Sequence, residues 1–292
     1  MLDIVIKECS NLDSVTELFN EHQNDPFTHL ANIYLFKLFS RLKSFRAFAA
    51  EVDSQIVGYI YTMRYMYDHG WIGGLLVHKS FRKMGIGTRL LEKALQSLGH
   101  GYIYLFVEPE NVAAKRFFEN AGFNAIYRRL NYVIQVPFNE SRCKNSDINY
   151  EVEWDDLTTA LGFKERGSIV STGYYPIKVT KDVFEDLKNR RKVLKCGNVL
   201  AIVENSHNIG INGYTFTFND YILKGLSIHP KEKIVEVNPF YTNAKVPDLI
   251  KLINSLAPDV KVSIWTYQED PVIRMLPLKM TSGILVMELH MH

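Results

Sequence analysis

Residues 71–98 constrain the fold of this 292-residue chain more than any other stretch. They begin with an apolar run at 71–77, continue through a basic turn with two glycines at 82–88, and end in an amphipathic run at 90–98. Apolar residues recur at helical spacing in the last part, at 91, 94, 95 and 98, which is typical of a helix with one buried face. The stretch therefore predicts a strand, a loop and a helix.

The loop between this strand and this helix has the composition of an anion-binding site. The first amides of a helix have no intrahelical acceptor, and the helix dipole places partial positive charge there. Gly85 and Gly87 let phosphate oxygens approach the backbone, and Arg82 and Lys83 add charge. A pyrophosphate fits this pattern, although a plain strand-to-helix turn also fits it. No Gly-Lys-Ser/Thr closes the loop and a third glycine is missing, so it is neither a Walker loop nor a dinucleotide fingerprint.

A second motif follows the helix. Residues 102–107 are apolar and aromatic and predict another strand. A short helix is expected over 111–121, because Asn111 is a favourable N-cap residue and Gly122 suits a helix C-terminus. Ala114 and Phe118 lie three and seven positions after Asn111.

Taken in order, the two motifs resemble the GNAT superfamily of acyl-CoA N-acyltransferases. The pattern is Arg82-x-x-Gly85-x-Gly87 after a Leu-x-Val strand, then Asn-x-x-Ala-x-x-x-aromatic-x-x-x-Gly-Phe from Asn111. The resemblance covers roughly residues 1–137. It implies an α/β (α+β) fold, with a mixed, mostly antiparallel central sheet flanked by helices, and transfer of an acetyl group from acetyl-CoA to an amine by direct attack.

The resemblance also implies where acetyl-CoA binds. Strand 75–77 is expected to hydrogen-bond the pantetheine arm where two central strands splay apart, and the loop amides are expected to hold the pyrophosphate. The implied cofactor contacts are Leu75, Leu76, Val77, Arg82, Lys83, Met84, Gly85, Ile86, Gly87, Thr88, Asn111, Ala114 and Phe118.

The catalytic groups are less clear from the sequence. Many members of the superfamily have a tyrosine acid at the position of Phe118, and phenylalanine has no proton to donate. Tyr104 or Tyr127 could replace it, or water could protonate the thiolate. Glu51, Glu108 and His78 are candidate bases, although the glutamates could equally be solvated strand ends.

The length of the chain predicts two domains. We expect an acetyltransferase domain at 1–137, a polar linker at 138–149, and a degenerate copy at 150–292. Apolar segments of the second half repeat those of the first at shifts of about 150–160 residues. Residues 238–247, where its phosphate loop would stand, contain two prolines and no Gly-x-Gly, so no CoA site is expected there.

Composition limits the remaining function classes. The formal net charge of +2 gives no reason to expect nucleic-acid binding, and no apolar run is long enough to span a membrane. No signal peptide is evident, so a cytoplasmic location is the default. The three cysteines, Cys9, Cys143 and Cys196, suggest neither a disulfide framework nor a zinc site, and His290 and His292 are too few ligands for a metal.

Local patterns complete the expectations. Hairpins are expected at 48–63, around Asp53 and Ser54, and at 125–136, and a helix at 28–42. The functional alternatives are an N-acetyltransferase acting on a small-molecule or peptide amine, an acyl-CoA sensor or regulatory protein with little turnover, and a purely structural protein. A monomer and a homodimer are both compatible with the sequence.

Overall fold

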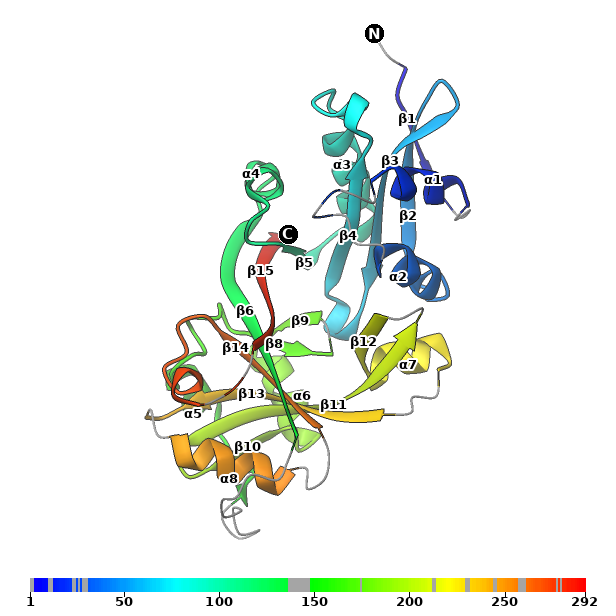
Figure 1. The fold of residues 1–292 in the computed structure, drawn as a ribbon. Coiled ribbons are helices and arrows are strands. Elements are labelled where there is room, and N and C mark those ends of the chain that lie inside the picture. The colour runs from blue at the N-terminus through cyan, green and yellow to red at the C-terminus, as the bar shows by residue number, and fades with distance from the viewer. Residues whose placement is uncertain are drawn as a thin grey trace.

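The computed structural model describes residues 3–9, 13–22, 25, 27, 31–135, 148–173, 175–211, 214–228, 232–243, 246–256, 261–276, 278 and 280–292. They form an α/β fold with one large mixed sheet and a separate two-stranded hairpin. Figure 1 shows the N-terminal half, in blue and cyan, above the C-terminal half, with two long strands running between them.

The N-terminal half contains five strands and four helices in the described part of the chain. The strands are β1 (Val5–Glu8), β2 (Arg46–Val52), β3 (Gln55–Arg64), β4 (Gly70–Val77) and β5 (Gly101–Val107), and the helices are α1 (Asp13–Glu21), α2 (Ala31–Phe39), α3 (Ile86–Leu98) and α4 (Val112–Asn120). The predicted strand, loop and helix over 71–98 are confirmed as β4 and α3. The first hairpin is confirmed too, and its turn residues Asp53 and Ser54 both have positive φ.

The C-terminal half contains eight strands and four α-helices among its described residues. The strands are β7 (Ile148–Asn149), β8 (Ile169–Thr172), β9 (Tyr175–Lys178), β10 (Val193–Cys196), β11 (Val199–Ile211), β12 (Tyr214–Asn219), β13 (Glu232–Tyr241) and β14 (Lys261–Tyr267). The helices are α5 (Trp154–Thr159), α6 (Lys181–Asn189), α7 (Asp220–Leu226) and α8 (Val246–Leu256). Two further strands, β6 (Asn124–Gln135) and β15 (Met280–Met291), connect the halves.

The two halves repeat one sheet topology. From one edge the order is β1-β2-β3-β4-β5, and from the other it is β7-β10-β11-β13-β14. In both series three antiparallel pairs are followed by one parallel pair, β4–β5 or β13–β14. This agreement in strand order and direction supports the duplication that the sequence suggests.

The halves exchange strands at the middle of the sheet. Strand β15, the last of the chain, lies between β5 and β6, and β6 pairs in turn with β14 (Figure 1). The side chain of Met287 in β15 is fully buried in the core beneath α3. The N-terminal half therefore completes its sheet with residues that lie 178 to 190 positions from their partners in β5.

The predicted hairpin at 125–136 is wrong. The segment forms a single 12-residue strand, β6. Its first part, from Asn124 to Tyr132, pairs with β15, and its last part, from Arg129 to Gln135, pairs with β14. Because both neighbours come from the far end of the chain, the segment satisfies its backbone hydrogen bonds without folding back on itself.

The hairpin of β8 and β9 joins the C-terminal half to the N-terminal half. The Tyr65 hydroxyl donates a hydrogen bond to the Pro176 carbonyl, and Nε2 of His69 accepts one from the Lys178 amide at 3.0 Å. The ring of Tyr175 packs edge-on against Trp71, 5.1 Å between centroids. Burial lowers the pKa of His69 to about 4, so its ring stays neutral and can accept this bond.

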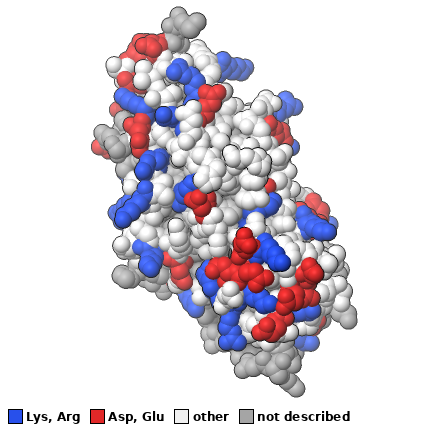
Figure 2. Space-filling model, turned by 180° about the vertical axis from the view of Figure 1, so that it is seen from behind, with Lys and Arg blue, Asp and Glu red and all other residues white. Residues whose placement is uncertain are grey.

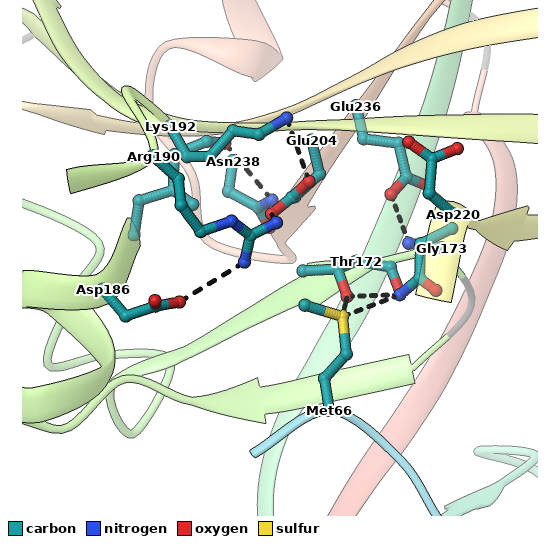
Figure 3. A network of polar contacts seen from close by, with 12 residues as sticks. Met66, Thr172, Gly173, Asp186, Arg190, Lys192, Glu204, Asp220, Glu236 and Asn238 are labelled. Atoms are coloured by element: carbon teal, nitrogen blue, oxygen red, sulfur yellow. Dashed lines mark hydrogen bonds and ion pairs between the residues drawn. The ribbon is translucent and has the colours of Figure 1, made fainter. Parts of the chain in front are cut away.

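A buried polar network holds the other side of this hairpin (Figure 3). Glu236 of β13 accepts hydrogen bonds from the Gly173 amide and, at 3.0 Å, from the indole of Trp265. Its carboxyl is fully buried, and this burial raises its pKa to about 8. Glu204, its cross-strand neighbour, pairs instead with Lys192 at 3.2 Å and with Arg190 at 3.5 Å. The environment of Glu236 therefore favours a neutral carboxyl, whereas its neighbour Glu204 lies beside two basic side chains.

Two further expectations concern the cysteines and the linker. Cys9 is a free thiol, but Cys196 is disulfide-bonded, so the expectation of no disulfide is wrong. Wide spacing in the sequence does not keep cysteines apart in the fold, and β10 carries Cys196 to the sheet edge beside β7. Most of the predicted linker, residues 138–149, lies outside the described residues, while its last two residues form β7. The domain boundaries stay a prediction.

Candidate active site

Strands β4 and β5 separate soon after they meet. Their parallel pairing comprises two positions, Gly70 with Ile103 and Trp71 with Tyr104. Beyond this point β4 bulges against β3, because Gly73 lies opposite Tyr61 while Leu76 lies opposite Tyr59. Gly74 adopts a φ of +65°, a conformation that glycine reaches without steric cost. The paired glycines, Gly73 and Gly74, thus mark a bulge.

A cavity of about 190 Å³ opens where the two strands diverge. Its walls are residues 72–75 of β4, residues 105–108 of β5, and side chains from both faces of the sheet. On the face of α3 and α4, it is lined by Ala114 and Phe118. On the face of α2, it is lined by Leu35, Tyr61 and Trp71. The gap between the strands therefore joins the two faces of the sheet.

The glycine-bearing loop begins α3 close to this cavity. Gly85 caps the helix with a φ of +80°, and a Cβ at this position would meet no atom within 4 Å. The first intrahelical bond runs from the Arg89 amide to the Gly85 carbonyl, so the amides of residues 86–88 precede it at the positive end of the helix. This open, uncovered backbone is suited to an anion.

Arg82 anchors the loop. Its Nε donates to the Val77 carbonyl at 3.1 Å, and its guanidinium pairs with Asp25 at 3.2 Å. Burial alone would raise the pKa of Asp25, but hydrogen bonds from Arg82 and the Phe27 amide bring that pKa below its ordinary value. Arg82 therefore joins the end of β4 to the segment between α1 and α2.

The second motif forms helix α4 as predicted. Asn111 caps it, and the side-chain oxygen of Asn111 accepts a hydrogen bond from the Ala114 amide at 3.0 Å. Phe118 is buried against Phe123 and lines the cavity. Phe117 approaches the loop, since a Cβ on Gly87 would lie 3.5 Å from its ring. The two motifs thus meet at one end of the cavity.

The structure separates the candidate catalytic residues. Glu108 lines the cavity. Glu51 lies on β2 and forms an ion pair with Lys7 of β1, and neither Glu51 nor Tyr104 lines the cavity. Tyr104 is buried and donates a hydrogen bond to Glu288 at 2.7 Å, and burial raises its pKa well above the ordinary value.

The two other candidates also lie outside the cavity lining. His78 pairs with Glu21 at 2.8 Å and accepts a hydrogen bond from the Ser80 amide. Tyr127 is buried, which raises the pKa of its hydroxyl. Glu108 is therefore the candidate that the fold brings to the cavity.

Sequence reasoning missed the aromatic wall of the cavity. Tyr61 and Trp71 are both nearly inaccessible, and the Trp71 indole donates a hydrogen bond to the Tyr61 hydroxyl at 3.4 Å. Phe106 packs edge-on against Trp71 at 4.7 Å. The alternation of Tyr102, Tyr104 and Phe106 could have indicated that one face of β5 is aromatic, but no local pattern shows that Trp71 faces it.

Residues of the C-terminal half complete this wall. Ile284 of β15 lines the cavity. The Arg129 guanidinium lies between the rings of Phe106 and Trp265, 4.1 and 4.2 Å from their centroids, an arrangement that favours a buried cation. It also donates a hydrogen bond to Ser171 at 3.2 Å. The far half of the chain thus fixes the position of Phe106.

The corresponding gap in the C-terminal half is filled. Strands β13 and β14 pair up to Val237 and Ile264 and then diverge. The buried guanidinium of Arg166 bridges them there, donating to the Pro239 carbonyl at 2.6 Å and to the Trp265 carbonyl at 3.1 Å. Asp270 lies 3.9 Å from it. An arginine side chain therefore occupies the place where the N-terminal half has a cavity.

Other kinds of site find less support in the described part of the chain. No group of three or more potential metal ligands is present in it, and none of its helices is long and apolar enough to cross a membrane. On the face shown in Figure 2, acidic and basic side chains are intermixed rather than gathered in one basic field.

Known proteins resemble this chain in its first half. Residues 12–123 match the model of the Acetyltransferase (GNAT) family. N-alpha-acetyltransferase 30 of Homo sapiens is 27% identical over 130 residues, which cover 42% of this chain and 35% of that protein. The N-alpha-acetyltransferase of Sulfurisphaera tokodaii is 28% identical over 102 residues, 29% of this chain and 61% of that protein. The chain thus spans about a third of the length of the first of these relatives.

Solved structures were also compared with the chain. A structure from Thermoplasma acidophilum aligns with 98% of this chain and 99% of its own, at 12% identity and a TM-score of 0.49. The ribosomal-protein-S18-alanine N-acetyltransferase of Escherichia coli aligns with 48% of this chain and 86% of its own, at 22% identity and a TM-score of 0.37. The family model and the motifs at β4–α3 and α4 thus agree that residues 12–123 of this chain match the GNAT family of acetyltransferases.

Proposed function

We propose that the protein transfers an acetyl group from acetyl-CoA to an amine at the cavity between β4 and β5. The observation that carries this proposal is the cavity at the splay of β4 and β5, which is lined from both faces of the sheet and lies at the end of β4 that leads into the α3 loop. The relatives named N-alpha-acetyltransferase support an amine acceptor.

In this proposal the loop and the splayed strands hold the co-substrate. The amides of residues 86–88 and the charge of Lys83 bind the pyrophosphate. The backbone of Leu75, Leu76 and Val77, left without a β5 partner by the splay, binds the peptide-like pantetheine arm. Ala114 and Phe118 of α4 form the apolar floor of that arm, and Asn111, the N-cap of α4, lines the same part of the cavity. Met84, Arg82 and Thr88 lie in or beside the loop and shape its rim.

The chemistry is a direct attack. The neutral amine nitrogen forms a bond to the thioester carbonyl carbon, and the carbon–sulfur bond breaks to release CoA thiolate. The amine loses one proton, which Glu108 accepts directly or through water, and the thiolate gains one from the Tyr61 hydroxyl or from water. Phe118 provides no proton for this step, so the tyrosine that lines the cavity is the better candidate acid.

Release of CoA in the presence of an amine panel tests the proposal. The free thiol is followed colorimetrically with acetyl-CoA and the full-length chain. Amine-dependent release that is lost in Gly85→Leu supports the transferase. Tight acetyl-CoA binding with no release for any amine would instead support the alternative, an acyl-CoA sensor with little turnover.

A further inference from the structure

We infer that the acceptor is a monoamine whose amino group is attached to an apolar side chain or ring, and not a polycation. This inference rests on the proposed function and adds the class of its substrate. It is based on the α2 face of the cavity, which lies across the sheet from the α3 loop. Since CoA phosphates bind at α3, the α2 face is the side from which the acceptor enters.

The lining of this face is apolar. Phe27, Leu35, Tyr61, Trp71 and Ile284 contribute to it. Among the described lining residues of the whole cavity, Glu108 is the one with a charged side chain. One carboxylate can pair with or deprotonate a single amino group, and the remaining wall can only bury apolar surface.

The segment that carries two of the lining residues is basic. The sequence from Pro26 to Ala50, which carries Phe27 and Leu35, contains no aspartate or glutamate. It contains four basic residues, Lys37, Arg41, Lys43 and Arg46, and all four are exposed. A spermidine, an aminoglycoside or a lysine-rich peptide would find a single carboxylate, Glu108, in the described lining and no counter-charge there for its further ammonium groups.

The size of the cavity suits a compact apolar group. Its volume of about 190 Å³ is comparable with the roughly 150 Å³ apolar cavities that accommodate a benzene molecule. One aromatic ring or one branched aliphatic side chain therefore fits beside the reacting amine. The edges of Trp71 and Phe106 suit such a ring, because their mutual packing is already edge-to-face at 4.7 Å.

An apolar monoamine can come from two sources, a small arylalkylamine or a peptide with an apolar N-terminal residue. The experiment compares 2-phenylethylamine, spermidine, and two tetrapeptides that differ only in an N-terminal Phe or Asp. Values of kcat/KM are obtained from CoA release with the full chain. We expect 2-phenylethylamine or the Phe peptide to exceed spermidine at least tenfold, which is the discrimination that one apolar group supplies. The preferred member of that pair identifies the source.

Two variants are compared by the ratio of two kcat/KM values, so that partial unfolding of a variant does not affect the result. Leu35→Glu places a second carboxylate in the α2 face, so the ratio of kcat/KM for spermidine to that for 2-phenylethylamine should rise at least tenfold. Leu161→Glu makes the same change at an exposed site in the C-terminal half and should leave the ratio unchanged. A ratio does not depend on the fraction of folded enzyme.

The outcomes separate the two proposals. Turnover of spermidine at or above the apolar amines, or an unchanged ratio in Leu35→Glu, would overturn the acceptor class while leaving acetyl transfer intact. No CoA release with any of the amines, under conditions in which acetyl-CoA binds, would overturn the transferase and the acceptor class together.

Discussion

The indole of Trp71 donates a hydrogen bond to the Tyr61 hydroxyl at 3.4 Å, directly beside the bulge of β4. Both groups lie over Gly73, where an added Cβ would overlap the Tyr61 ring and hydroxyl and come within 2.9 Å of the indole nitrogen. The aromatic wall of the cavity therefore depends on a missing side chain. Tyr61 of β3 and Trp71 and Gly73 of β4 therefore form one structural unit.

Replacing Gly73 with alanine should disrupt this unit. The new methyl group must displace Tyr61, which is packed among buried aromatic rings and cannot move freely. We expect kcat/KM to fall at least tenfold, and overpacking to cost about 1–3 kcal/mol of unfolding free energy. Gly210→Ala is the matched control, because a Cβ there meets nothing within 4 Å. Equal activity in the two variants would contradict a role for the wall.

The phosphate loop can be tested at both ends of one helix. Gly85 and Gly99 flank α3, have φ of +80° and +72°, and are open to a Cβ. Leucine should cost roughly 1–2 kcal/mol at Gly85, whose backbone is left-handed, and more at Gly99, whose φ of +72° is combined with a ψ of −113° outside that region. Gly85→Leu should also lower acetyl-CoA affinity at least tenfold in calorimetry, whereas Gly99→Leu should retain it. Similar losses of affinity would show that strain, not the loop, is responsible.

Glu108 should act on the chemical step more than on binding. Glu108→Gln keeps the shape of the side chain and removes the base, so kcat is expected to fall about 10²-fold or more, with acetyl-CoA affinity within about twofold of the original. Glu51→Gln provides the comparison, since Glu51 pairs with Lys7 at the other edge of the sheet. An equal fall in kcat in Glu51→Gln would contradict the assignment of Glu108 as the base.

The buried carboxyl of Glu236 predicts how stability depends on pH. Its folded-state pKa of about 8 lies above the ordinary value of 4.5, so the folded chain binds more protons than the unfolded chain between these values. Its stabilising contribution is complete below pH 4.5 and is lost as pH rises through 8. His69, with a pKa lowered from 6.5 to about 4, has the opposite effect below pH 6.5.

Unfolding free energies between pH 6.5 and 8 therefore isolate Glu236. Stability should fall with rising pH in this window, with a slope of at most about 1.4 kcal/mol per pH unit from this group. Glu236→Gln cannot ionise and should remove that slope in urea titrations. A slope that persists in Glu236→Gln would mean that another group causes it.

The exchanged strand predicts that the C-terminal end of the chain stabilises the acetyl-CoA site. Met287→Ala removes a fully buried side chain of β15 from the core beneath α3 and should cost about 2–5 kcal/mol. Met280→Ala changes the same strand at a side chain that is 44% exposed and should cost less than about 0.5 kcal/mol. The melting temperature measured with acetyl-CoA bound should follow the same order. Equal effects would indicate that β15 is dispensable.

The sequence predicted what is encoded locally. Strand β4, helix α3 and the Asn111 cap of α4 each follow from residues within one turn or a few positions of one another. The pairing of β15 with β5 and β6 was not predictable in this way, because it joins residues such as Leu285 and Val107 that no short-range pattern connects.

In the candidate site, too, residues placed by local sequence could be predicted and residues placed by strand register could not. Glu108 follows directly from the end of β5, so its place at the cavity could be predicted. The aromatic wall could not, because Trp71 and Tyr61 face each other only through the register of β3 and β4. The position of Arg166 in the gap between β13 and β14 could not be predicted either. The absence of a glycine loop in the second half was visible in the sequence, but the arginine that fills the gap comes from a different segment, before β8.

Calorimetric titration of acetyl-CoA into the full-length chain tests the central claim most directly. One binding site per chain is expected, with Kd below about 100 μM, and it should be lost in Gly85→Leu and kept in Gly99→Leu. Two sites per chain, or binding that survives Gly85→Leu unchanged, would contradict a single acetyl-CoA site at the N-terminus of α3.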